Sequence, residues 1–227
     1  MAVRGSAAPL PLSHFSGLIL AIRSELQMFP EITRDDVFRL ETERLWLRWP
    51  RAADAAAFVK LAGDPEVALK TAQIPQPYET RDAESFIMRA RAENTEGAGL
   101  SLVLAPKRQP NEAIGVIGAH GADARGVATI GFWLGKPFWG QGFMGEAAAG
   151  FLDLIFGVTS LERVESRIMS ANAASRRVHE KLGFESLGAC LCPAPARGGE
   201  VPGELFRLGR GAIHTTFGVR HPRFPSS

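Results

Sequence analysis

The sequence predicts an α/β (α+β) domain built on a mixed, mostly antiparallel central sheet with flanking helices. Side chains alternate between the two sides of the chain over residues 44–49 and 163–169, which is the period of a β-strand. Three apolar segments follow one another over residues 100–134 with only short polar turns between them, which favours antiparallel pairing. The last of these segments leads through a glycine-rich turn into an alanine-rich segment, which predicts a strand, a turn and a helix.

The elements are expected in the order strand, helices, three strands, helix, strand, helix and two strands, which makes a sheet of about six to seven strands. Pro50 ends the first strand, and Pro75 and Pro77 exclude a regular helix around them because proline lacks the backbone N–H. The predicted strands cover residues 40–49, 100–104, 113–118, 127–134, 163–169, 184–192 and 204–208. The predicted helices cover residues 54–61, a short segment from 65, 81–94, 147–156 before Gly157, and 172–182 before Gly183.

The chain divides into an N-terminal extension over residues 1–38, one folded domain over 39–211 and a C-terminal tail over 212–227. Small residues and prolines at its start predict that the extension is partly disordered, and residues 14–29 have the pattern of a short amphipathic helix. A length of 227 residues fits one domain with such extensions.

The composition is that of a globular protein, with 45% apolar and 22% charged residues. A formal net charge of +2 without blocks of like charge disfavours nucleic-acid binding. No apolar run reaches the roughly 18 residues of a membrane span, so we expect no membrane partner. The two cysteines form no disulfide framework, which fits a reducing cytoplasm, and we expect a monomer or homodimer. Cys190 and Cys192 lack a nearby histidine pattern, so we expect no metal site and interpret them as small strand residues facing opposite sides.

The turn before the 147–156 helix predicts a binding site for a phosphate or pyrophosphate. Its sequence is Trp139-Gly140-Gln141-Gly142-Phe143-Met144-Gly145-Glu146-Ala147. The first N–H groups of a helix have no partner within the helix, and the helix dipole adds positive charge. Glycines remove the Cβ atoms that would keep an anion away from those groups. A tight turn without a ligand is the alternative. A dinucleotide site is disfavoured because the strands before the turn are joined by short antiparallel turns, without the helical crossovers of a dinucleotide-binding fold.

A second motif lies downstream and consists of Asn172, Ser175, Val178 and Glu180-Lys181-Leu182-Gly183-Phe184. Together with the glycine turn and the opening Leu40-Glu41-Thr42-Glu43-Arg44-Leu45, it resembles the GNAT acyltransferases, in particular the branch that includes ribosomal-protein N-terminal alanine acetyltransferases. The resemblance implies the GNAT fold, in which two central strands splay apart. It also implies acetyl-CoA as co-substrate and a primary amine, either a protein N-terminus or a small molecule, as acceptor.

The resemblance also implies the contacts with the pyrophosphate of acetyl-CoA. Gly140 is expected to supply room, and the N–H groups that follow it are expected to bind the anion. These N–H groups belong to Gln141, Gly142, Phe143, Met144 and Gly145. The family usually has Gly or Ala where Met144 stands, so the side chain of Met144 must point away from the phosphate.

Other contacts implied by the resemblance involve the splayed strand and the last helix. The strand is expected to leave backbone groups of Phe132, Trp133 and Leu134 free for the pantetheine arm. Asn172 resembles the side-chain ligand of that arm, although asparagine is also a good helix N-cap. Ser175 is expected near the thiolate, and Arg177 near the CoA 3′-phosphate.

The catalytic base is not evident from the motifs. This branch often has a carboxylate two residues before the glycine of the strand that leads to the turn, but here that residue is Thr129, which is not a competent base. His120 acting through water is one candidate, although a polar strand end is its simpler interpretation. Glu79, Glu84 and Asp123 are other candidates, and an α-amine of low pKa needs no strong base.

Ser175 is the candidate acid that protonates the leaving thiolate, because the last helix lacks the tyrosine that many family members use. Its simpler interpretation is a hydroxyl in the first turn of a helix. Glu146 is interpreted as complementing the helix dipole rather than as a catalyst. We therefore predict an N-acetyltransferase that acts by direct attack of a primary amine in a ternary complex. The alternative is a non-catalytic acyl-CoA-binding module that has lost its general base, as Thr129 suggests.

Overall fold

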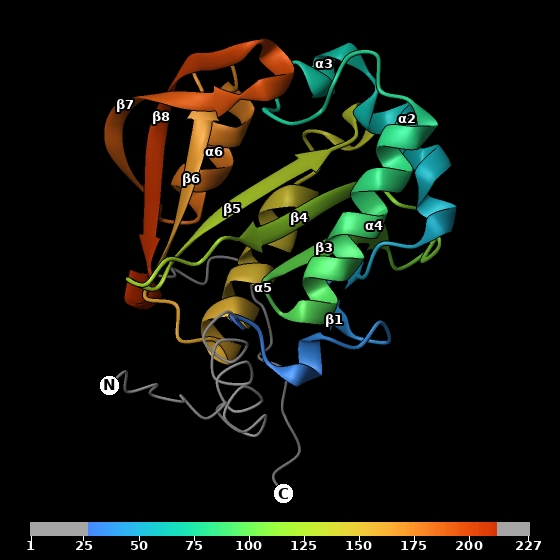
Figure 1. Ribbon diagram of the computed structural model, residues 1–227, viewed down its shortest axis with the longest axis horizontal. Coiled ribbons are helices and arrows are strands. Elements are labelled where there is room, and N and C mark those ends of the chain that lie inside the picture. The colour runs from blue at the N-terminus through green and yellow to red at the C-terminus, as the bar shows by residue number, and fades with distance from the viewer. Residues whose placement is uncertain (1–26, 213–227) are drawn as a thin grey trace, which may run out of the picture.

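A computed structural model describes residues 27–212, so the tail after residue 212 and nearly all of the helix expected over residues 14–29 lie outside the described residues. The described chain forms one eight-stranded sheet in the order β1-β2-β3-β4-β5-β6-β8-β7 (Figure 1). Strands β5 and β6 are parallel, and the other neighbouring strands are antiparallel. The strands are β1 (Arg39–Glu41), β2 (Leu45–Arg48), β3 (Gly99–Pro106), β4 (Gly115–His120), β5 (Val127–Leu134), β6 (Arg163–Met169), β7 (Glu185–Ala194) and β8 (Gly199–Gly209).

The helices occur in the predicted order and confirm the predicted mixed architecture. They are α2 (Ala55–Ala62), α3 (Pro65–Ala68), α4 (Thr80–Glu96), α5 (Phe143–Val158) and α6 (Ala173–Lys181). Over residues 27–212, no helix combines the length and the apolar character that a membrane span requires.

The opening segment forms two strands rather than the single strand predicted. The chain reverses direction after Glu41, and the N–H of Thr42 donates to the carbonyl of Leu45 at 3.0 Å. The Thr42 hydroxyl in turn accepts the N–H of Leu45 at 3.2 Å, so a side chain stabilises this turn. Because β1 then pairs with β2, the sheet has one strand more than the sequence predicted.

The bounds of α5 also differ from the prediction, since the helix begins at Phe143 rather than at Ala147. The glycine turn itself forms its N-terminus, with Gly142 as N-cap. Gly157 does not end the helix, which runs to Val158 and is closed by the N–H of Thr159 donating to the carbonyl of Ile155.

Alternate residues of the strands pack into cores on the two faces of the sheet. Leu102 and Leu104 of β3 belong to the main core, which includes α5, whereas Val103 packs with residues of α2 and α4. Helices α5 and α6 therefore cover one face of the sheet, and α2 and α4 cover the other (Figure 1).

A buried amide fixes α4 against the sheet. The side chain of Asn94 is 1% exposed, and its Nδ2 donates to the carbonyl of Ser101 at 3.0 Å while its Oδ1 accepts the N–H of Ser101 at 2.7 Å. This pair satisfies the backbone of β3 where β2 no longer covers it, because the β2–β3 pairing begins only at Val103.

The two central strands splay apart, as the family resemblance implied. β5 pairs with β4 from Thr129 to Leu134, but it pairs with β6 only over Val127–Thr129. Beyond Thr129 the two strands diverge, as Figure 1 shows, and the edge of β5 that faces β6 is left without a neighbouring strand.

The interpretation of the two cysteines is wrong in one respect. Cys190 and Cys192 are two positions apart on β7, so both thiols point to the same side of the strand, with their sulfur atoms 3.9 Å apart. Burial raises the pKa of Cys192 to about 11, so its thiol stays protonated near neutral pH.

Candidate active site

The glycine turn leaves several backbone N–H groups free. Gly140 and Gly142 have φ angles of 74° and 80°, in the region that favours glycine. Among the described residues, the N–H of Glu146 is the first of the helix to donate to a backbone carbonyl, that of Gly142, so the preceding N–H groups of residues 140–145 have no backbone acceptor. A Cβ atom at Gly140 would meet no atom within 4 Å, so the space in front of it is open. This geometry fits a bound pyrophosphate.

The side chain of Met144 has the orientation that the predicted pyrophosphate site requires. Its side chain is 6% exposed and packs into the main core. The methionine therefore points away from the open side of the turn, and its backbone N–H remains available to an anion.

A brace that the sequence did not predict holds the glycine turn in place. The carboxylate of Glu146 is 5% exposed and accepts bonds from the Thr42 hydroxyl at 2.6 Å and from the Arg44 N–H at 2.7 Å. The guanidinium of Arg44 bonds the same carboxylate at 2.6 Å, donates to the carbonyl of Gln141 at 2.9 Å and lies 4.5 Å from the ring centroid of Phe143.

The brace explains the ionisation of Glu146. Burial tends to raise its pKa, but the hydrogen bonds from Thr42 and Arg44 and the charge of Arg44 outweigh burial and lower it. An ionised Glu146 therefore anchors the β1–β2 turn to the first turn of α5. The sequence predicted that Glu146 lies in the first turn of the helix, but it did not predict these hydrogen bonds to Thr42 and Arg44.

The splayed strand offers part of the backbone expected for the pantetheine arm. The carbonyl of Leu134 is not free, because it accepts the indole N–H of Trp139 at 2.7 Å. The backbone groups of Phe132 face no strand on the β6 side, whereas those of Trp133 face β4, where its carbonyl lies against Gly115. The ring of Trp133 lies edge-on to Phe58 at 5.5 Å, and Phe132 packs against the main core.

A cleft of about 850 Å³ opens where β5 and β6 diverge. Its walls come from α4, from the 70–78 segment, from the central strands and from α6. The predicted site residues in its lining are His120, Phe132, Trp133, Asn172 and Ser175. Leu134, Arg177 and the glycine turn lie outside the lining.

His120 is held in this cleft by two side chains. Its Nδ1 lies 3.0 Å from Oε2 of Glu93 on α4, and its Nε2 lies 3.3 Å from Oγ of Ser101 on β3. His120 ends β4 and is paired with Thr129, the residue at which β5 parts from β6. The imidazole therefore lies at the apex of the splay, within the cleft.

The environment of His120 suits a general base. Burial lowers the pKa of His120, the charge and hydrogen bond of Glu93 oppose burial, and the charge of Arg89 lowers the pKa further. The net shift is downward, so the imidazole is neutral near pH 7 and can accept a proton. The carboxylate of Glu93, 3.0 Å from Nδ1, is placed to stabilise an imidazolium at this position.

Two glycines make room for the imidazole. A Cβ atom at Gly118 would lie 2.7 Å from Nε2 of His120 and 2.8 Å from Oγ of Ser101. A Cβ atom at Gly99 would lie 2.7 Å from Nδ1 of His120. Both contacts are too short for a real side chain, so the position of the His120 ring requires glycine at both sites.

Replacing Gly118 by alanine is therefore expected to displace the ring of His120 and to lower kcat for acetyl transfer by about 100-fold, since catalytic groups tolerate little displacement. Steady-state kinetics with a fixed amine would measure the change. Gly209→Ala is the matched control, because it adds the same methyl group to a strand glycine with no atom within 4 Å, outside the cleft. Equal activity in the two variants would contradict this role of Gly118.

Asn172 is the N-cap of α6, as its simpler interpretation held. Its Oδ1 accepts the N–H of Ser175 at 3.1 Å, and its Nδ2 donates to the carbonyl of Lys70 at 3.0 Å. Both ends of the amide are thus used within the chain, so the predicted contact with the CoA arm would replace the bond to Lys70.

Ser175 lies beside a histidine that the sequence did not single out. Nδ1 of His179 lies 2.8 Å from the carbonyl oxygen of Ser175, which requires a proton on Nδ1, and 3.5 Å from the Ser175 hydroxyl. His179 is 1% exposed and stacks on Phe132 at 5.2 Å. Burial lowers the pKa of His179 to about 4, so it is neutral and cannot donate a proton as an imidazolium.

The other candidate bases lie away from the cleft lining. Glu79 forms an ion pair with Arg81 at the start of α4, and Glu84 is exposed. Asp123 accepts N–H groups within its own turn. None of these three carboxylates lines the cleft, which leaves His120 as the member of the predicted set that does.

Hydrogen bonds join residues 68–74, which precede α4, to the turn between β7 and β8. The guanidinium of Arg197 donates to the carbonyls of Thr71 at 3.3 Å, Ala68 at 3.1 Å and Ile74. The N–H of Ala196 adds a bond to the carbonyl of Ala72 at 3.2 Å. These bonds connect the two arms of the splay, so the cleft is bridged on this side.

Glu93 could have been found from helical spacing. Phe86, Ala90 and Glu93 follow the i, i+4, i+7 pattern, so Glu93 extends the apolar face of α4. A carboxylate on the face of a helix that packs on the sheet requires a partner. No comparable signal in the sequence identifies Arg197, whose contacts are made only through backbone carbonyls.

Comparison with known proteins agrees with this geometry. The family model described as an acetyltransferase (GNAT) domain matches residues 44–185. An uncharacterised N-acetyltransferase, p20 of Bacillus licheniformis, is 30% identical over 170 residues, which cover 74% of this chain and 94% of that protein.

Solved structures share the fold at lower sequence identity. A ribosomal-protein-serine acetyltransferase of Vibrio cholerae, described as putative, aligns with a TM-score of 0.65 at 20% identity, covering 77% of this chain and 98% of that one. The microcin C7 self-immunity acetyltransferase MccE, solved with acetyl-CoA and AMP, aligns with a TM-score of 0.64 at 19% identity, covering 74% and 93%. The chain therefore belongs to the GNAT acetyltransferase family, as an acyl-CoA N-acyltransferase that uses acetyl-CoA as its co-substrate.

Proposed function

We propose that this protein acetylates a primary amine by direct attack in a ternary complex, with His120 as the general base. The observation that carries the proposal is the Glu93–His120 pair at the apex of the splay, inside the cleft. This pair supplies the base that Thr129 cannot supply. Its position on the α4 face of the sheet supports an amine site on that side of the cleft.

In the proposed mechanism, the free N–H groups of the glycine turn bind the pyrophosphate, and the β5 edge at Phe132 aligns the pantetheine arm. His120 takes a proton from the attacking amine, directly or through one water, and Glu93 stabilises the resulting imidazolium. A backbone N–H of β5 polarises the thioester carbonyl. Ser175 relays a proton to the leaving thiolate and regains one from solvent water, and Arg177 contacts the 3′-phosphate.

The acceptor belongs to one of two classes, a protein N-terminus or a small-molecule amine. The first class is supported by the opening-strand motif and by the fold shared with the ribosomal-protein-serine acetyltransferase of Vibrio cholerae. We further propose that the protein acts in the cytoplasm, as a monomer or homodimer, and does not bind nucleic acid or membranes.

The test is to incubate the purified protein with acetyl-CoA and a panel of small amines and peptides, and to follow release of the CoA thiol and the mass of the products. Acetylated amine with equal release of thiol is expected. Calorimetry with CoA on the same preparation separates the alternative, because binding without thiol release on any amine would indicate a non-catalytic acyl-CoA-binding module.

A further inference from the structure

Charged side chains of the cleft differ in whether they have partners. Five lysine, arginine, aspartate and glutamate residues line it, namely Lys70, Asp82, Arg89, Glu93 and Arg167. The carboxylate of Glu93 pairs with His120, and that of Asp82 accepts the N–H of Glu79 at the start of α4. Both carboxylates are therefore engaged within the chain.

The positively charged side chains of the cleft make fewer polar contacts than these two carboxylates. Nζ of Lys70 lies 4.4 Å from the ring centroid of Trp139, and Cζ of Arg89 lies 5.9 Å from that of Phe86. Within residues 27–212, the guanidinium groups of Arg89 and Arg167 have no carboxylate partner and make no hydrogen bond. Two unpaired positive charges thus remain in the cleft, where they can meet a ligand anion.

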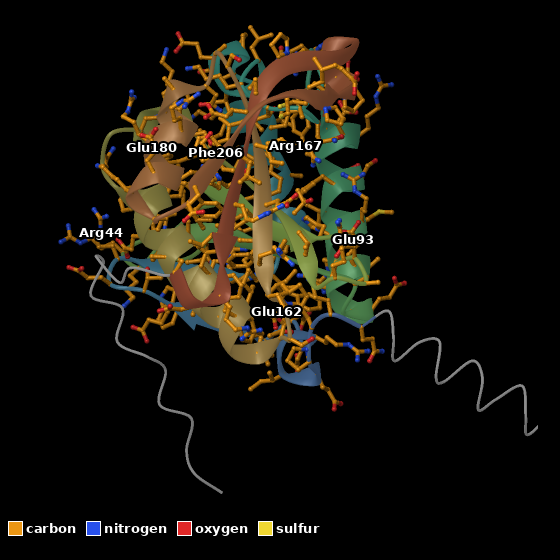
Figure 2. All side chains as sticks on the ribbon, turned by 90° about the vertical axis from the view of Figure 1, so that its left-hand side faces the viewer. Arg44, Glu93, Glu162, Arg167, Glu180 and Phe206 are labelled. Atoms are coloured by element: carbon orange, nitrogen blue, oxygen red, sulfur yellow. The ribbon has the colours of Figure 1, made fainter. Side chains whose placement is uncertain are left out.

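Both arginines lie on the side of the sheet that holds His120. On β6, Val164 and Ile168 pack into the main core, so Arg167 between them points to the opposite face, toward α4. Figure 2 shows Arg167 and Glu93 on one side of β6, with Glu180 of α6 on the other. Arg89 lies one helical turn before Glu93 on α4 and acts on the pKa of His120 through its charge.

Arg167 lies further along the cleft than the base. Glu165 of β6 is paired with Thr129, which is paired with His120, so β6 is two strand spacings, about 10 Å, from His120. Each strand residue advances about 3.3 Å, so the backbone of Arg167 lies roughly 7 Å beyond Glu165. Because Arg167 and His120 both line the cleft between these strands, an anion held by the guanidinium lies a few bonds from an amine at His120.

We propose that the acceptor is a primary amine that carries an anionic group a few bonds from its nitrogen, and that Arg89 and Arg167 bind this group from opposite walls of the cleft. The inference rests on the proposed function and specifies its substrate class. The anion is the carboxylate of a free amino acid or an acidic side chain near the N-terminus of a peptide, and these two sources share the same chemistry.

The test compares kcat/KM within matched pairs of acceptors. L-Alanine against L-alaninamide reports on the free carboxylate, and the amidated tripeptides Ala-Asp-Ala and Ala-Asn-Ala report on an acidic second residue. Arg89→Gln and Arg167→Gln are each expected to lower kcat/KM for the anionic member of one pair by about 10- to 100-fold, as for loss of a charged hydrogen bond. The assays are run at about pH 8, where His120 is neutral even without the charge of Arg89, so the neutral member should stay near its wild-type value.

Arg81→Gln is the matched control, because it removes an exposed arginine of the same helix that pairs with Glu79 outside the cleft. The pair that responds identifies the source of the anion. Wild-type enzyme that shows no preference within either pair, or arginine variants that lower both members equally, would overturn the inference while leaving acetyl transfer intact. No acetylation of any amine by protein that still binds CoA would instead overturn the proposed function, and the inference with it.

Discussion

Replacing His120 by asparagine is expected to lower kcat for acetyl transfer by about 100- to 10,000-fold, the usual contribution of a general base. The affinity for acetyl-CoA should remain near the wild-type value, because the glycine turn lies outside the cleft that holds His120. Calorimetric titration with acetyl-CoA and stopped-time assays at saturating amine would measure both quantities. Thr129→Val is the control within the cleft, and it should retain most of the activity because threonine is not a competent base.

The pH dependence of kcat provides an independent readout of the same residue. The pKa of His120 is lowered by burial, so its base form predominates at pH 7, and kcat at saturating acceptor should fall as the pH drops below the ordinary range of a histidine. Glu93 raises the pKa of His120, so Glu93→Gln should move this acid limb to still lower pH and reduce the plateau. An acid limb that does not move in the Glu93 variant would contradict the pairing.

The succession of strands and helices along the chain could be predicted from local patterns because periodicity and turn chemistry are local properties. The 163–169 strand was predicted with its observed bounds, and so was the 127–134 strand. The extent of pairing between these strands was not available from periodicity, since each keeps its alternation whether or not it has a neighbour. The splay was expected only from the family resemblance, and the short β5–β6 register confirms it.

The candidate site also has one part that local sequence predicts and another that depends on how the elements pack together. The glycine turn is contiguous in sequence, so its free N–H groups and the need to turn Met144 inward could be predicted. The Glu93–His120 pair joins α4 to β4, and the Arg44–Glu146 brace joins residues 102 positions apart. Such pairs depend on how helices lie on the sheet, and neither strand nor helix periodicity specifies that arrangement. The sequence shows that Thr129 stands where related proteins often have a carboxylate. It does not show that Gly99 and Gly118 leave room for the ring of His120.

The second large effect is expected at Gly140. Gly140→Asp would place a carboxylate in front of the free N–H groups, where the cofactor pyrophosphate is proposed to bind, and charge repulsion should raise the Kd for acetyl-CoA by about 10- to 100-fold. The substitution can be accommodated sterically, because a Cβ atom at this position meets no atom within 4 Å. Its φ of 74° is a conformation that aspartate and asparagine tolerate better than most residues.

Gly140→Asn separates charge from backbone strain, because asparagine has nearly the same shape and backbone preference but no charge. We expect the Kd of the asparagine variant to lie much closer to the wild-type value. Acetyl-pantetheine, which lacks the pyrophosphate, should bind all three proteins equally, since its contacts are expected along β5. If the aspartate and asparagine variants lose acetyl-CoA affinity equally, or if acetyl-pantetheine binding falls in parallel, the turn acts through its shape alone and does not bind the pyrophosphate.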